Sequence, residues 1–151
     1  MERYAKTFTV RWADCDANGH MRNTAYSEYA TEVRLANFAD HGFAWERFVE
    51  MGVGLVVLRE EIDYLREMRL SESLEADYTV LGLSPETARF KLAHDFTKTN
   101  GKPAARIVIS GGWLDMRTRR LIAPPEPVAA VMRSVPRADA FIELPPLPER
   151  P

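Results

Sequence analysis

Polar and apolar residues alternate from Lys6 to Trp12, which is the period of a half-buried β-strand. Phe8, Val10 and Trp12 share the face that we expect to be buried. From Thr24 to about Phe38, apolar residues instead recur every three or four positions, as on one face of an amphipathic helix. The first part of the chain therefore predicts one strand followed by one long helix.

The connection between these elements, residues 13–23, is rich in Asp, Asn and Gly and is expected to be a loop. Asn23 suits the N-cap of the helix, because its side-chain oxygen can accept a hydrogen bond from an unpaired backbone N–H. Gly42 is expected to end the helix, since glycine readily adopts the left-handed conformation found there. A short second helix is predicted over Trp45 to Met51.

Four further strands are predicted after Gly52, where β-branched and aromatic residues become frequent. They cover Val53–Arg66, Leu74–Leu83, Thr87–Lys98 and Ala104–Met116. Asn100-Gly101 between two alternating runs is a strong hairpin signal. One strand, one long helix and a four-stranded meander indicate an α+β fold in which the helix covers an antiparallel sheet.

The length of 151 residues corresponds to one domain, since domains usually have about 100–200 residues. Most of the 10 prolines lie from Pro124 onward. We therefore expect a single domain over residues 1–134, including a short helix from Val128 to Arg133. Residues 135–151 are expected to be a proline-rich C-terminal tail that is extended or mobile.

The composition is that of an ordinary globular domain, with 46% hydrophobic and 28% charged residues. The formal net charge is −2 without a block of like charges, so neither nucleic acid nor an anionic membrane surface is an expected partner. The single cysteine excludes an intrachain disulfide and every zinc pattern built on a cysteine pair. We expect no signal peptide, no membrane span and a cytoplasmic location.

Most residues that could carry chemistry lie in the loop before the long helix. They are Asp14, Asp16, Asn18, Gly19, His20 and Asn23. Their order matches the opening of a calcium-binding EF-hand loop, but the twelfth position of that loop must be a bidentate glutamate and is Ala25 here. We therefore expect no metal site. A second interpretation is that these residues only cap the helix and satisfy the loop backbone.

A third interpretation assigns chemistry to this loop. A carboxylate on a loop that leads into a helix faces the unpaired N–H groups of the helix N-terminus and their partial positive charge. These groups can stabilise the oxyanion that forms when a carbonyl is attacked. The attack could come from water activated by the carboxylate or from the carboxylate itself. Such a loop has the minimum apparatus for hydrolysing an activated acyl compound.

Residues 12–29 resemble the signature of hotdog-fold acyl-CoA and acyl-carrier-protein thioesterases, the 4-hydroxybenzoyl-CoA thioesterase-like group. That signature reads approximately Asp-x-Asp-x-x-Gly-His-Val-Asn-Asn-x-x-Tyr. Its fixed positions recur here as Asp14, Asp16, Gly19, His20, Asn23 and Tyr26. Met21 and Arg22 stand where Val and Asn are usual. The resemblance covers about residues 5–133 and implies a hotdog fold, in which a five-stranded antiparallel sheet wraps around one long central helix.

By this resemblance Asp16 is the catalytic carboxylate, and the backbone N–H of Asn23 polarises the thioester carbonyl. Asp14 helps to shape the loop. The residues implied in substrate binding are Trp12, Gly19, His20, Arg22 and Tyr26. No metal or organic cofactor is implied. Outside the motif, His94 falls on the apolar face of a predicted strand and is expected to be structural.

The resemblance implies a thioesterase that hydrolyses an acyl-CoA or acyl-carrier-protein thioester to a carboxylic acid and a free thiol. Two alternatives stay open. A hotdog hydratase or dehydratase would need an acid and a base on opposite sides of the acyl chain, for which His20 with the partner subunit's Glu28 or the partner subunit's Glu32 is the candidate pair. A non-enzymatic module would bind the same acyl thioesters without turnover.

At least a homodimer is expected, and a homotetramer is compatible with the resemblance. A sheet that wraps around one helix leaves an exposed edge, which natural proteins cover or pair. In such a dimer, the acyl groove is expected between the helix start of one subunit and strand residues 59–66 of the other.

Overall fold

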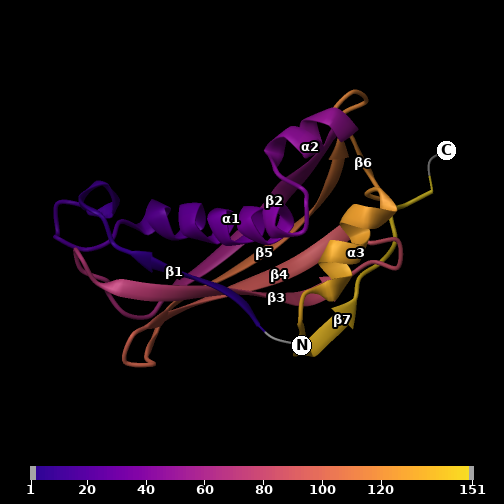
Figure 1. Ribbon diagram of the computed structural model, residues 1–151. Coiled ribbons are helices and arrows are strands. Elements are labelled where there is room, and N and C mark those ends of the chain that lie inside the picture. Colours follow the sequence, from indigo (N-terminus) through magenta and orange to yellow (C-terminus); the bar gives the residue numbers. More distant parts are fainter. Residues whose placement is uncertain (1–2, 150–151) are drawn as a thin grey trace.

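A single sheet of seven strands carries the longest helix along one face in the computed structural model, which describes residues 3–149 (Figure 1). The strands are β1 (Tyr4–Thr9), β2 (Val53–Tyr64), β3 (Ser73–Leu83), β4 (Arg89–Lys98), β5 (Pro103–Asp115), β6 (Arg120–Ile122) and β7 (Arg137–Glu143). The helices are α1 (Asn23–Asp40), α2 (Trp45–Met51) and α3 (Glu126–Ser134), and a 3-10 turn covers Trp12–Asp14. Within residues 3–149, no helix is long and apolar enough to cross a bilayer.

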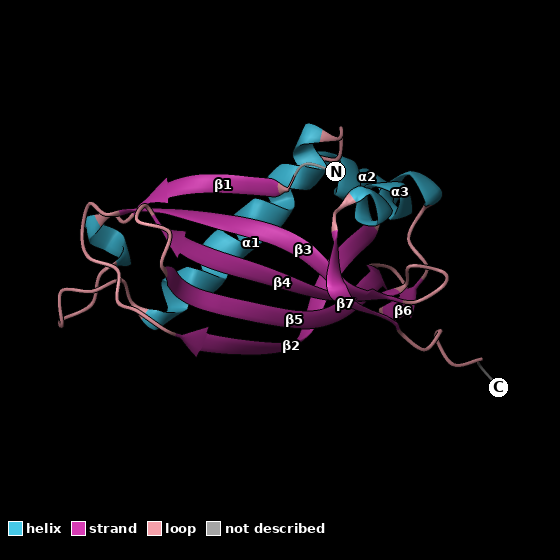
Figure 2. Cartoon of the chain, turned by 90° about the horizontal axis from the view of Figure 1, so that it is seen from below, coloured by secondary structure: helices cyan, strands magenta, loops and turns pink. Residues whose placement is uncertain are grey.

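The main strands follow the hydrogen-bonded order β1-β3-β4-β5-β2 and are antiparallel, with β6 added to β5 and β7 added to β3 (Figure 2). The loop before α1 lies at one end of the sheet, and α3 and β7 lie together at the other (Figure 1). The predicted hotdog fold, an α+β arrangement with a sheet around one long helix, is confirmed.

The core lies between α1 and the sheet, because the apolar side chains of α1 recur at helical spacing. The buried apolar residues of α1 are Ala25, Tyr26, Tyr29, Ala30, Val33 and Phe38. Buried partners from the strands include Leu74, Tyr78, Leu92, Phe96, Ile107 and Ile109. Burying a large apolar side chain contributes about 1.5–3 kcal/mol, so this interface fixes α1 on the sheet and thereby positions the loop that precedes it.

The number and order of the strands differ from the prediction. We expected five strands, and β6 and β7 extend the sheet to seven. The four strands after α2 do not form one meander, because β2 pairs with β5 at the edge of the main order and not with β3. Periodicity locates a strand in the sequence, whereas its partner is set by contacts between distant residues.

The first strand and the long helix begin and end differently from the prediction. β1 ends at Thr9, and Trp12 is 81% exposed rather than buried. The reason is a turn at residues 12–14, in which the carboxylate of Asp14 accepts a hydrogen bond from the backbone N–H of Arg11 at 2.9 Å. The N-cap of α1 is Arg22 and not Asn23, and no side chain caps the helix. Asn23 is therefore the first helical residue.

Part of the proline-rich C-terminal segment is a strand. β7 runs parallel to β3. Backbone hydrogen bonds of 2.9 Å flank this pairing, from Val80 N–H to the carbonyl of Pro136 and from Leu144 N–H to the carbonyl of Leu83. We expected an extended or mobile tail over residues 135–151, and residues 137–143 are extended and paired with the sheet.

Candidate active site

The loop before α1 is held by the buried carboxylate of Asp14. Arg11 donates to it from the backbone N–H and from Nε and Nη2, at 2.9, 3.1 and 3.0 Å, and the hydroxyl of Tyr29 on α1 also donates. Burial alone would raise the pKa of Asp14, but these hydrogen bonds outweigh burial and lower the pKa to about 2. Because the oxygens of Asp14 are occupied and the side chain is buried, Asp14 shapes the loop.

Asp16 lies two residues further on and is exposed. Its backbone N–H donates to the carbonyl of His20 at 2.9 Å, and its carbonyl accepts from Gly19 at 3.0 Å, where glycine has a φ of +76°. One carboxylate oxygen accepts the backbone N–H of Asn18 at 2.8 Å. The other makes no hydrogen bond within residues 3–149, so it is available to a substrate or a water.

Asn23 supplies the N-terminal N–H of α1. The first N–H groups of a helix have no carbonyl one turn earlier to accept their hydrogen bonds, and they carry the positive end of the helix dipole. Asn23 is exposed, and its carbonyl accepts a hydrogen bond from the hydroxyl of Tyr64 at 3.2 Å. The expected side-chain cap is absent, so its predicted role depends on the backbone N–H alone.

Both predicted catalytic residues line one cavity of about 320 Å³. Its other lining residues are His20, Met21, Tyr26, Tyr64, Leu65, Arg66 and Glu67. A neighbouring cavity of about 670 Å³ also reaches Asp16 and is lined by Trp12 and Gly19. The structure therefore brings Asp16, Asn23 and four of the five predicted binding residues to adjoining cavities.

Arg22 is the predicted binding residue that lines neither cavity. Its guanidinium donates to the hydroxyl of Thr24 at 3.0 Å and to the carboxylate of Glu28 at 3.3 Å. Glu28 was a candidate acid for a dehydratase with His20 of another subunit. Within this chain, Glu28 pairs with Arg22, and Nε2 of His20 lies 3.0 Å from the carboxylate of Glu67.

Tyr26 forms the buried wall of the cavity. Its ring contacts the rings of Tyr64 and Phe96 edge-on, each at a centroid distance of 5.4 Å. Burial raises the pKa of Tyr26 to about 12, with smaller contributions from Tyr64 and Glu72, so its hydroxyl is neutral at ordinary pH. Tyr26 therefore contributes an uncharged aromatic side chain to this wall.

The sequence did not predict that Tyr64, Leu65, Arg66 and Glu67 line the site of their own chain. They come from the end of β2 and the connection that follows it. Residues 64–66 of the same chain line the cavity. The expected contribution of residues 59–66 from a partner subunit stays a prediction. No sequence signal places them at the site of their own chain, because only the folding of β2 alongside α1 brings them to a loop more than forty residues earlier.

A carboxylate loop at the start of a helix that lies on an antiparallel sheet is the arrangement expected from the resemblance to hotdog thioesterases. A sequence profile of the thioesterase-like superfamily matches residues 10–132, and the chain belongs to this superfamily. A search of curated protein sequences found no match.

Solved structures with the same fold include three that are similar over most of the chain. A hypothetical protein from Staphylococcus aureus in complex with CoA is 23% identical, with a TM-score of 0.79 over 91% of this chain and 88% of that one. A 1,4-dihydroxy-2-naphthoyl-CoA thioesterase from Synechocystis is 14% identical, with a TM-score of 0.79 over 88% and 97%. A DHNA-CoA thioesterase from Staphylococcus aureus is 17% identical, with a TM-score of 0.73 over 82% and 81%. At these identities the comparison establishes the fold.

Proposed function

We propose that this protein hydrolyses acyl-CoA thioesters to a carboxylic acid and free CoA. The observation that carries the proposal is the cavity that Asp16 shares with Asn23, the first residue of α1. The names of the Synechocystis thioesterase and of the complex with CoA support CoA as the thiol donor. A carrier-protein donor has no such support.

In the proposed reaction, the thioester carbonyl accepts a hydrogen bond from the backbone N–H of Asn23. As the carbonyl carbon is attacked, negative charge moves onto its oxygen, where this N–H and the dipole of α1 stabilise it. Because the charge is larger in the transition state than in the substrate, the interaction lowers the barrier.

Asp16 supplies the second part of the apparatus. Its carboxylate either takes a proton from water, so that hydroxide attacks the carbonyl carbon, or attacks the carbon itself to form an anhydride that water then hydrolyses. The C–S bond breaks in both cases. On the first route Asp16 passes the proton that it took from water to the leaving thiolate, and on the second route water protonates the thiolate. The hydrogen bond from Asn18 N–H orients one carboxylate oxygen and leaves the other for this step.

We further propose a homodimer that forms through β2. This strand ends the main order of the sheet, so its outer edge has no partner within residues 3–149. Val57 and Leu58 on this strand are 39% and 66% exposed. Unpaired edges of this length invite pairing with another chain, and antiparallel pairing of two β2 strands about a two-fold axis would make one continuous sheet.

Residues 1–134 are proposed as the catalytic domain and residues 135–151 as a C-terminal extension of it. A cytoplasmic location is proposed from the composition and the single cysteine.

A panel of acyl-CoA thioesters, assayed for thiol release, tests the function and its rivals. The proposal predicts that free CoA is released with turnover. A dehydratase would change the enoyl absorbance without releasing a thiol, and a binding module would bind the thioesters and do neither. Either of the last two results would overturn the proposal.

A further inference from the structure

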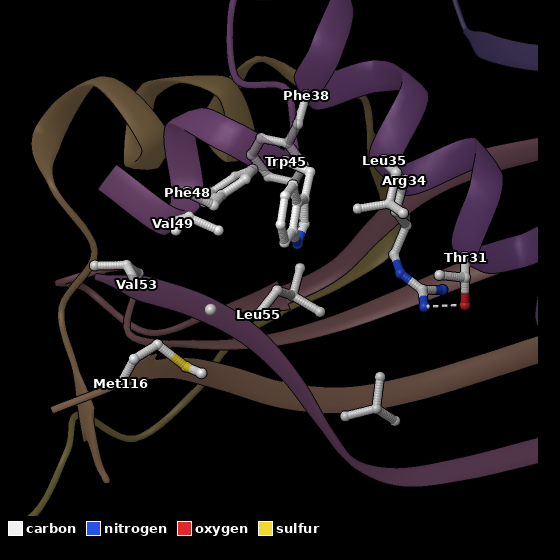
Figure 3. A pocket seen from close by; sticks show the side chains of 12 residues that line it. Thr31, Arg34, Leu35, Phe38, Trp45, Phe48, Val49, Val53, Leu55 and Met116 are labelled. Carbon is white, nitrogen blue, oxygen red and sulfur yellow. Dashed lines mark hydrogen bonds between the residues drawn. The ribbon is translucent and has the colours of Figure 1, made fainter. Parts of the chain in front are cut away.

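An apolar cavity of about 370 Å³ lies between α1, α2 and the first half of β2 (Figure 3). Its apolar lining includes Leu35, Phe38, Trp45, Phe48, Val53 and Leu55. It does not reach Asp16 or Asn23 of the same chain. Its size and lining suit an acyl chain or an aromatic acyl group.

One charged side chain lines this cavity. Arg34 of α1 is only 5% exposed, although it lies on the side of the helix that the sequence pattern marks as polar. Its guanidinium donates to the hydroxyl of Thr31 through Nη2 and to Nε2 of His94 through Nη1, both at 3.0 Å. Arg34 and Thr31 lie at the end of the cavity away from α2 (Figure 3).

Both partners of this guanidinium are neutral. Burial, together with the charge of Arg34, lowers the pKa of His94 to about 3. Nδ1 of His94 donates to the carbonyl of Asp77 at 2.7 Å, so Nε2 is the atom that accepts from Arg34. His94 is therefore structural, as expected, and it holds Arg34 in place without offsetting its charge.

The positive charge of Arg34 has no anionic partner in contact. Within residues 3–149, Arg34 makes no ion pair, and its Nε makes no hydrogen bond. Glu60 on β2 acts on it only at longer range. Buried cations are nearly always paired with an anion, because a charge removed from water is costly. An arginine that lacks such a partner and lines an apolar cavity is suited to an anion supplied by a ligand.

We propose that this cavity holds the acyl part of the substrate and that Arg34 pairs with a carboxylate at the far end of that acyl part. The protein would then prefer CoA thioesters of dicarboxylic acids over those of simple fatty acids. This inference rests on the proposed thioesterase function, and it adds a determinant of substrate specificity to it.

The proposed dimer explains how one acyl group reaches both sites. The apolar cavity is lined by Leu55 near the start of β2, and the Asp16 cavity is lined by Tyr64 at its end. Along the strand, these two residues are about 30 Å apart, at about 3.3 Å per residue. In an antiparallel pair of β2 strands, the start of one strand lies beside the end of the other. Arg34 of one subunit would therefore select the substrate that is hydrolysed at Asp16 of its partner.

The test measures the binding of CoA thioethers, which cannot be hydrolysed, by isothermal titration calorimetry. Pairs of S-alkyl-CoA and S-(ω-carboxyalkyl)-CoA are compared over a series of chain lengths. We expect the carboxylated member to bind at least about tenfold more tightly at the best length, the size of one charge-assisted hydrogen bond. Arg34→Met should remove this preference, and Arg34→Lys should keep part of it. Arg47→Met, which changes an exposed arginine of α2 outside the cavity lining, should leave the preference intact.

The absence of a carboxylate preference at every length in the wild-type protein would overturn this inference, even if Arg34→Met did not fold. A preference that persists in folded Arg34→Met would overturn it as well. Since binding is measured without turnover, failure of the thioesterase proposal shows separately, as the absence of thiol release from every acyl-CoA.

Discussion

The hydroxyl of Tyr29 on α1 donates a hydrogen bond to the buried carboxylate of Asp14 in the preceding loop. This contact ties the loop that carries Asp16 to the helix whose N-terminus carries Asn23. The two predicted catalytic groups come from different elements, and their relative position depends on this tie together with the three donors of Arg11.

Tyr29→Phe removes this hydroxyl while keeping the ring that packs against Phe8. The carboxylate of Asp14 then stays buried with one donor fewer, so we expect the free energy of unfolding to fall by about 1–3 kcal/mol. Urea unfolding measures the change. Tyr4→Phe is the matched control, because it removes a hydroxyl that donates to the exposed carboxylate of Asp40, and its effect should be smaller. Equal losses in both variants would contradict the structural role of Asp14.

The pH dependence of stability should also report on Asp14. Its pKa is about 2 in the folded protein, against an ordinary value of 3.8, so the ionised form stabilises the fold above the ordinary value. This contribution is lost as the pH falls toward 2. We expect the free energy of unfolding to decrease between about pH 5 and pH 2.

Asp14→Asn provides the comparison for this prediction. The variant should be less stable near neutral pH and should show a shallower decrease on acidification. Other carboxylates with lowered pKa values, such as Asp40 and Glu72, account for the part that remains. Parallel curves for the variant and the wild type would show that Asp14 does not contribute.

Substitutions at Asn23 separate its backbone from its side chain. Asn23 is the first helical residue, a position that accepts proline, and proline lacks the N–H that we assign to the carbonyl of the substrate. Asn23→Pro should therefore lower kcat by about 100-fold, by analogy with the loss of an oxyanion donor, and leave the helix folded. Asn23→Ser should keep most of the activity. Steady-state kinetics and circular dichroism measure both, and equal severe losses would instead assign the role to the amide side chain.

The dimer proposal is tested at the edge of β2. Leu58→Asp places a charge on the exposed edge that we expect to be paired, so the variant should sediment as a monomer in analytical ultracentrifugation and lose most of its turnover. Ile142→Asp on β7 is the control, since that side chain is 51% exposed and lies away from β2. Full turnover by a monomer would refute the shared site.

The sequence predicted those parts of the fold that follow from local pattern. The bounds of α2, from Trp45 to Met51, agree with the prediction, because Trp45, Phe48 and Val49 recur there at helical spacing and glycine follows. The loop motif also predicted that Asp16 and Asn23 lie at the start of α1, since the loop and the helix are neighbours in the chain. Both predictions depended on residues close in sequence.

The features that were not predicted depend on contacts between distant residues. Tyr64 and Glu67 reach the site because β2 lies at the edge of the sheet beside α1, which no periodicity reveals. Arg34 was assigned to the polar side of the helix, and it is buried where its guanidinium contacts His94 on β4 and faces the cavity beside β2. The pairing of β7 with β3 was missed for the same reason, since the proline-rich composition around it favours an irregular chain.

The steady-state rate of thiol release by Asp16→Asn shows whether Asp16 is the catalytic carboxylate. The substitution keeps the size of the side chain and an oxygen that can accept from Asn18 N–H, and it removes the charge. We expect kcat to fall by about 100-fold or more with binding of the substrate retained, as for the loss of a general base or a nucleophile. Asp139→Asn, which neutralises an exposed carboxylate on β7, should leave kcat unchanged. Turnover of Asp16→Asn close to that of the wild type would rule out Asp16 as base or nucleophile.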